Sequence, residues 1–210
     1  MEIHLIRHGQ TAWNREQVFR GSQDVALDAT GRRQAWLLGR RLRRTPLDAI
    51  YSGPLARALQ TAKAIAAPKR KKVRVVDGLN DMSFGNWEGQ SHLAILKKDP
   101  AVYRTWKTNP WKAKIPGGSS LSQVQRRSWK AFRGILSTHG AGSRIAVISH
   151  RVVLKLLFLR MLGLGPEGFW KLKLAPCSLS VVQWDGEQFV LERLNDSCHL
   201  KGMNEHLMDF

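Results

Sequence analysis

Four cationic side chains follow predicted strands in the sequence, either directly or within a few residues. Arg7 and His8 end the apolar stretch "IHLI", Arg57 lies in "SGPLARALQTA", and His150 follows "SRIAVIS". Arginine presents planar donors to the oxygens of a phosphate, and a neutral imidazole can act as a nucleophile. Gly9 would let the backbone approach a ligand closely. If the fold brings these residues together, they form an anion site in which His8 takes up a phosphoryl group.

The predicted elements give a reason for that convergence. Residues 3–6, 47–53, 71–76 and 143–149 read as strands, and residues 28–44, 54–67 and 151–162 have the apolar spacing of helices. Strands that alternate with helices predict an α/β fold with three layers, in which helices flank a mostly parallel central sheet. The carboxyl ends of parallel strands line one edge of the sheet, where ligands bind. The four cationic residues therefore belong to one crevice.

Two further segments complete the predicted fold, which is a single domain over residues 1–210. Residues 81–140 contain no strand pattern, and we interpret them as a helical insertion over the sheet edge, a candidate lid. Within them a helix is expected to start near Ser119 or Ser120. At the other end, Asp185-Gly186 between two apolar stretches predicts a C-terminal antiparallel hairpin.

Composition restricts the classes of protein. The chain carries 34 Lys and Arg against 16 Asp and Glu, a net charge of +18, which attracts anions and polyanions. That charge fits an enzyme acting on phosphate esters, a nucleic-acid binder or simply a solvated surface. No secretory leader and no apolar run of membrane-spanning length are visible, so we expect a cytoplasmic protein without a membrane partner. Cys177 and Cys198 show no disulfide or metal-site spacing, and no metal is expected.

Taken together, five motifs resemble those of the histidine phosphatase superfamily, also called phosphoglycerate-mutase-like. They are "RHGQTAWN", "SGPLARALQTA", "LNDMSFGNWEG", "PGGSS" and "VISHRVVLK", and they follow the order and spacing of that family over nearly the whole chain. The resemblance implies that His8 is the nucleophile and becomes phosphohistidine, without a cofactor. It implies that Arg7, Asn14, Arg57 and His150 bind the phosphoryl group. It places Thr11, Arg20, Gly21 and Arg151 at the pocket mouth.

The proton donor is the point at which this chain departs from its relatives. They usually carry glutamate at the position of Asp81, although another branch of the superfamily uses aspartate. Asp81 is therefore the expected donor, and Glu88 in "NWEG" is the alternative, with a structural role near Gly89 as its other interpretation. A carboxylic acid that donates a proton needs a raised pKa, which burial usually supplies.

Other departures concern the pocket surroundings. Relatives often have glutamate where this chain has Ser119, and an uncharged polar residue where it has Arg20. A cation at Arg20 would select a substrate with a second negative group, or it is one more surface arginine of a basic protein. Several tryptophans either line an apolar wall of the site or pack the lid onto its domain: Trp87, Trp106, Trp111 and Trp170.

Three functions remain to be distinguished. Mutase relatives carry Arg-His-Tyr-Gly just after the acid, whereas this chain reads "DMSFGNWEG", the pattern of the phosphatase branch. We therefore predict a metal-independent phosphomonoester hydrolase acting on a small phosphorylated metabolite. Phosphoglycerate-mutase-type transfer is the alternative enzyme, and a catalytically idle polyanion-binding module is the alternative from another class. The sequence does not exclude a nucleic-acid partner and leaves a homodimer open.

Overall fold

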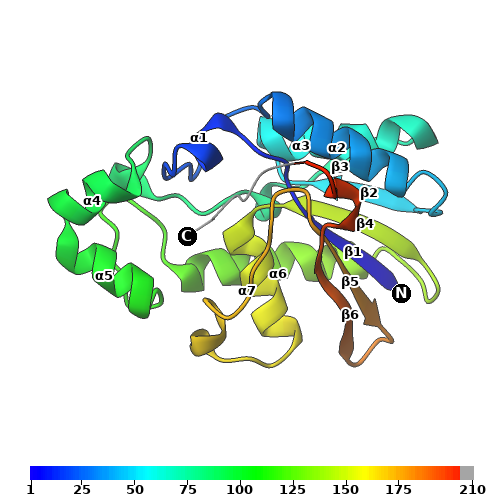
Figure 1. The fold of residues 1–210 in the computed structure, drawn as a ribbon. Coiled ribbons are helices and arrows are strands. Elements are labelled where there is room, and N and C mark those ends of the chain that lie inside the picture. The colour runs from blue at the N-terminus through cyan, green and yellow to red at the C-terminus, as the bar shows by residue number, and fades with distance from the viewer. Residues whose placement is uncertain (204–210) are drawn as a thin grey trace.

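A computed structural model describes residues 1–203 of the chain, and its centre is a six-stranded sheet (Figure 1). The strands lie in the order β3-β2-β4-β1-β5-β6. Their bounds are β1 Glu2–Arg7, β2 Ala49–Ser52, β3 Val73–Val75, β4 Arg144–Ser149, β5 Leu179–Trp184 and β6 Phe189–Asp196. All six predicted strands are therefore present.

The first four strands are parallel to one another, and the last two form the predicted hairpin. β4 lies between β1 and β2, so that Ile3 and Ala49 both pair with Ile145. β5 runs antiparallel to β1, and β6 antiparallel to β5. In the hairpin, the Asp185 carboxylate accepts hydrogen bonds from the backbone N–H groups of Glu187 and Gln188. This turn occupies residues 185–188, and β6 starts at Phe189.

Helices cover both faces of the sheet and make three layers, as predicted. Because side chains of a strand alternate between faces, Ile6 packs with Leu38 and Ala58 on one side, whereas Ile3 and Leu5 pack with the other helices. α2 and α3 form the first layer, and α6 and α7 form the second. The helices are α1 Ala12–Arg15, α2 Ala29–Arg41, α3 Ala56–Ala66, α4 His92–Lys98, α5 Pro100–Thr108, α6 Leu121–Leu136 and α7 Arg151–Met161, with short 3₁₀ turns η1 Ala67–Lys69, η2 Asp77–Leu79, η3 Gly85–Trp87, η4 Pro166–Gly168 and η5 Cys198–Leu200.

The stretch 81–140 contains two different parts. α4 and α5 extend beyond the sheet on the side where the parallel strands end (Figure 1, left), whereas α6 packs against α7. Ser120 caps α6 through a capping box with Gln123, which places its start where the sequence indicated. α6 is thus one of the helices that cover the sheet. A lid role for α4 and α5 stays a prediction.

Tryptophan side chains attach α5 to the rest of the domain. Trp106 is 1% exposed and packs edge-on against Phe84, Phe169 and Trp170. The Lys107 ammonium lies 5.2 Å from the centre of the Trp170 ring. Trp87 is buried as well. These contacts favour the interpretation in which the tryptophans pack the helical extension onto its domain.

Neither a membrane span nor a metal cluster is found where the structure describes the chain. Within residues 1–203, each helix is too short or too polar to cross a bilayer. The same residues contain no group of three or more His, Cys, Asp or Glu side chains able to hold a metal ion.

Candidate active site

The fold brings the four predicted cationic residues together. Arg7 ends β1, His150 precedes α7 as its N-cap, and Arg57 lies in the first turn of α3. Arg7, Arg57 and His150 are 0% exposed and His8 is 1% exposed. The centres of the His8 and His150 rings are 5.2 Å apart. The expected convergence at the carboxyl ends of parallel strands is thus present in the fold.

His8 is held in one orientation with a defined free nitrogen. Its Nδ1 lies 2.7 Å from the Gly9 carbonyl oxygen, which can only accept, so Nδ1 carries the proton of the neutral ring. The backbone N–H of His8 donates to Ser149, and its carbonyl accepts from Cys177. In this tautomer Nε2 keeps its lone pair, as a nucleophile requires.

Burial and neighbouring cations keep both histidines neutral. Burial, together with the charges of Arg57, His150, Arg7 and Arg20, holds the pKa of His8 well below its usual value. Burial likewise lowers the pKa of His150 to about 3, although the Asp81 carboxylate opposes that shift. Neither His150 ring nitrogen forms a hydrogen bond with a described residue. Buried polar atoms without partners are rare and indicate a place for a ligand.

Arg57 connects the site to two loops. Its Nη1 donates to the Gln23 carbonyl and its Nη2 to the Gly21 carbonyl, each at 2.7 Å. Nη2 also lies 3.1 Å from Oδ2 of Asp81. At the end of β1, Nη1 of Arg7 donates to the Leu174 carbonyl at 2.6 Å. Both guanidinium groups are therefore fixed before a ligand arrives.

Asp81 lies beside Arg57 and His150, and its pKa is lowered. Burial alone would raise its pKa, but the charges of His150 and Arg57 and the N–H of Met82 outweigh that effect and lower it. Oδ2 of Asp81 is 3.5 Å from Nδ1 of His150. The raised pKa expected for a proton donor is therefore not found for Asp81 in this structure.

Glu88 lies outside the cleft and joins two loops. Its carboxylate accepts from the N–H and hydroxyl of Ser22 and from the Gln23 amide on one side. On the other side it accepts from the Ser83 hydroxyl and the Phe84 N–H. A Cβ added to Gly21 would come within 2.0 Å of Oε1 of Glu88. This geometry favours the structural role of Glu88 over the alternative role of proton donor.

Glu88→Gln is expected to reduce kcat/KM about tenfold while the protein stays folded. The amide keeps one acceptor oxygen but loses the charge, so the loop that offers the Gly21 and Gln23 carbonyls to Arg57 loosens. Activity assays and thermal unfolding should be measured together, with Glu187→Gln in the exposed hairpin turn as the control. Full activity in a destabilised Glu88 variant would contradict a positioning role.

The predicted mouth residues differ in their position. Arg20, Gly21, Asn14 and Arg151 line a cleft that also includes His8. Thr11 is fully buried and is not among the lining residues. Its N–H and hydroxyl both donate to Oδ1 of Asn14 and hold that side chain in place. Thr11 therefore orients Asn14 and does not form the mouth.

Several cleft residues carried no recognisable signal in the sequence. The His92 ring stacks on Phe19 at 4.0 Å between ring centres, and its Nδ1 lies 3.2 Å from the Tyr103 hydroxyl. Arg127 on α6 donates to the Asn80 and Asp81 carbonyls and fixes the Asp81 loop. The remaining lining residues that sequence reasoning missed are Gln17, Val18, Phe84 and Val152.

A comparison with protein families identifies the chain. The model of the histidine phosphatase superfamily, branch 1, matches residues 3–197. The chain belongs to this superfamily. Its phosphatase relatives identify it as an enzyme of the phosphatase class.

Individual relatives cover nearly the full length of the chain. Phosphoserine phosphatase 1 of Hydrogenobacter thermophilus is 32% identical, over 95% of this chain and 94% of its own. A probable phosphoglycerate mutase of Yersinia enterocolitica is 31% identical, over 95% of both chains. The solved structure of Bacillus stearothermophilus YhfR superposes with a TM-score of 0.90 at 29% identity, over 95% of this chain and 99% of its own.

Proposed function

We propose that the chain hydrolyses a small phosphomonoester through a phosphohistidine at His8. The observation that carries this proposal is the neutral, fixed imidazole of His8 among Arg7, Arg57 and His150, all buried beneath one cleft. Phosphoryl transfer depends mainly on positioning and on stabilising the charge of the equatorial oxygens. Two guanidinium groups supply positive charge, and the neutral His150 ring can donate a hydrogen bond to a phosphoryl oxygen.

In the first step, the lone pair on Nε2 of His8 attacks phosphorus and the ester P–O bond breaks. The leaving oxygen takes a proton from Asp81, which has taken that proton up from solvent on binding of the substrate. A phosphate dianion adds negative charge next to the cations that hold Asp81 ionised, and it therefore raises the pKa of that carboxyl group. The amide of Asn14 donates to an oxygen of the same phosphoryl group.

In the second step, water replaces the histidine. Asp81, now ionised again, accepts a proton from the water as its oxygen attacks phosphorus, and the bond between phosphorus and Nε2 breaks. Inorganic phosphate leaves and His8 returns to its neutral form. The test is rapid quenching during turnover, followed by detection of phosphohistidine in the wild type and its absence in His8→Ala.

We also propose that the reaction needs no metal ion, because Arg7, Arg57 and His150 stabilise the charge that a metal would otherwise offset. Dialysis against EDTA is expected to leave kcat/KM within about twofold of its starting value, since no step is assigned to a metal. A loss of activity that returns on adding Mg²⁺, Mn²⁺ or Zn²⁺ would contradict this part of the proposal.

The cleft favours a substrate with a second negative group. Arg20 and Arg151 both line it, and the charge of Arg20 acts on His8, His150 and Asp81. Phosphoserine, the substrate in the name of one relative, carries such a group as its carboxylate. The substrate proposed here is therefore a small phosphate ester with a nearby carboxylate or second phosphate.

Arg20→Gln is expected to lower kcat/KM for phosphoserine about tenfold and for phosphoethanolamine, which lacks the carboxylate, less than twofold. The reason is that a charge-assisted bond to a carboxylate is worth about 1.5–3 kcal/mol. Equal losses on both esters would show that Arg20 does not recognise the second group. With 3-phosphoglycerate, release of phosphate supports the hydrolase, whereas formation of 2-phosphoglycerate would support the mutase.

A further inference from the structure

Much of the positive charge comes from one part of the chain. Residues 32–74 contain thirteen lysines and arginines and a single acidic residue, Asp48. Seven of these cations define what we call the basic surface: Arg40, Arg43, Arg44, Lys69, Arg70, Lys71 and Lys72. All are exposed except Lys69, which is half-buried.

The fold places these cations next to one another. The Lys69 ammonium donates to the carbonyl of Arg43, which joins the η1 turn to the end of α2, and Lys71 donates to the carbonyl of Asp48. α2 and α3 pack so closely that a Cβ on Gly39 would come within 2.4 Å of the Ala64 carbonyl. Among residues 1–203, no carboxylate forms an ion pair with any member of the basic surface. The charge is therefore available to a partner.

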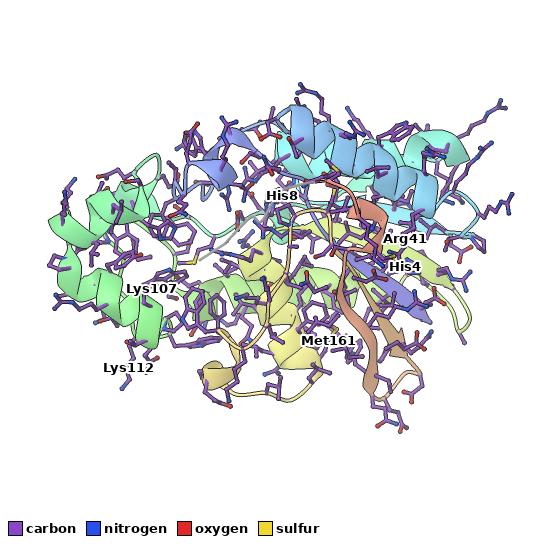
Figure 2. The ribbon with its side chains drawn as sticks, viewed as in Figure 1. His4, His8, Arg41, Lys107, Lys112 and Met161 are labelled. Carbon is purple, nitrogen blue, oxygen red and sulfur yellow. The ribbon has the colours of Figure 1, made fainter. Side chains whose placement is uncertain are left out.

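The basic surface lies away from the cleft. α2 starts next to the loop that follows His8, because the N–H of its N-cap Asp28 donates to the Gln10 carbonyl. The thirteen residues of α2 span about 20 Å, so its far end lies about that distance from this loop. In Figure 2, His8 lies toward one end of α2 and Arg41 at the other, on the side opposite α4 and α5. Charges so far apart are largely screened at physiological salt, where the Debye length is about 8 Å. The basic surface therefore does little to hold a small substrate at His8.

An exposed aromatic ring accompanies the charges. Trp36 on α2 is 55% exposed, and the Arg40 guanidinium carbon lies 4.8 Å from the centre of its ring. A tryptophan backed by arginine offers a flat surface on which a nucleobase can stack. A membrane-binding helix would present a broad apolar face instead. The neighbours of Trp36 on α2 that are exposed are arginines, Arg32, Arg33 and Arg40.

We propose that the basic surface and Trp36 bind single-stranded nucleic acid, separately from the phosphatase cleft. The arginines and lysines contact successive phosphates, for which a planar guanidinium group is well suited, and Trp36 stacks on a base. An acidic protein segment could use the charges but would not need the ring. This second surface would keep the enzyme near a polyanion while its cleft stays open to small esters.

The test measures the fluorescence anisotropy of a labelled single-stranded oligonucleotide of about 20 nucleotides over a range of salt concentrations. The wild type is expected to bind with an affinity that falls steeply with salt. Arg40→Gln/Arg43→Gln/Arg44→Gln is expected to bind about tenfold more weakly at low salt, and its salt slope should fall by about two, since each lost contact removes about 0.7. Trp36→Ala should weaken binding to the oligonucleotide severalfold and leave binding to inorganic polyphosphate unchanged.

The control variant removes the same charge elsewhere: Lys130→Gln/Lys171→Gln/Lys173→Gln, on exposed positions of α6 and the segment after η4. Phosphoserine hydrolysis should be unchanged in both triple variants, which separates this proposal from the proposed function. Equal losses of oligonucleotide binding in both triple variants would overturn the proposal, because only net charge would matter. Tighter binding to anionic lipid vesicles or to polyglutamate than to the oligonucleotide would overturn it as well.

Discussion

His8→Ala is expected to reduce phosphatase activity at least about 10⁴-fold, the scale on which removal of a nucleophile acts in covalent catalysis. The imidazole of His8 supplies the atom that bonds to phosphorus, whereas Asp81 in the same cleft is assigned to proton transfer. Arg7, Arg57 and His150 remain, so the variant should still bind phosphate. Loss of turnover with retained phosphate binding is therefore the expected pattern, measured by a steady-state assay and by calorimetry.

The matched control for this variant is His4→Ala. His4 lies on β1, the strand that precedes His8, and is buried as well, but it pairs with Glu2 and lies away from the cleft (Figure 2). Its removal should lower stability and leave kcat/KM of the folded fraction unchanged. If His8→Ala kept more than about 1% of the wild-type rate while His4→Ala kept all of it, the phosphohistidine mechanism would be wrong.

The convergence of Arg7, His8, Arg57 and His150 could be predicted from the sequence because it follows from topology. Arg7, His8 and His150 lie at or directly after the end of a strand, and Arg57 lies in the first turn of the helix that follows a strand. Parallel strands end at a common edge of the sheet, so these residues meet there. The hairpin could be predicted from Asp185-Gly186 for a similar reason, since its signal is local. Turn signals and the direction of strands that alternate with helices can therefore be predicted from a single sequence.

Side-chain contacts between residues far apart along the chain could not be predicted from the sequence. Thr11 was expected at the mouth but points its hydroxyl at Asn14, and Glu88 holds two loops together through partners up to 66 residues away. His92 reaches the cleft because it stacks on Phe19, from a segment without strand periodicity. These positions depend on how loops pack against one another, and loop residues show no repeating pattern from which packing could be inferred.

The pKa of Asp81 could not be predicted from the sequence for the same reason. Its position in the motif could be recognised, but its charge state depends on Arg57 and His150, which come from elements 24 and 69 residues away along the chain. Burial and charge act in opposite directions on this carboxyl group, and only the folded arrangement shows that charge prevails.

Asp81→Asn is expected to slow hydrolysis of esters with poor leaving groups by about 10²–10³-fold, the range typical of a lost general acid. Serine is a poor leaving group and needs a proton from Asp81, whereas nitrophenolate leaves without one. Hydrolysis of nitrophenyl phosphate should therefore fall less than tenfold in the same variant. Asp77→Asn, which removes an exposed carboxylate of the neighbouring η2 turn, is the control and should change neither rate.

The pH dependence provides an independent test of the same role. In the free enzyme the pKa of Asp81 is lowered, so the carboxyl group is ionised at neutral pH, and it acquires its proton only with the phosphate dianion bound. The pH dependence of kcat reports pKa values in the enzyme–substrate complex. We therefore expect kcat for phosphoserine to fall as pH rises through the raised pKa of Asp81 in that complex. His8 does not produce this limb, since its lowered pKa keeps it neutral throughout. In Asp81→Asn the alkaline decline should disappear, and equal losses on both esters with an unchanged pH profile would mean that another group donates the proton.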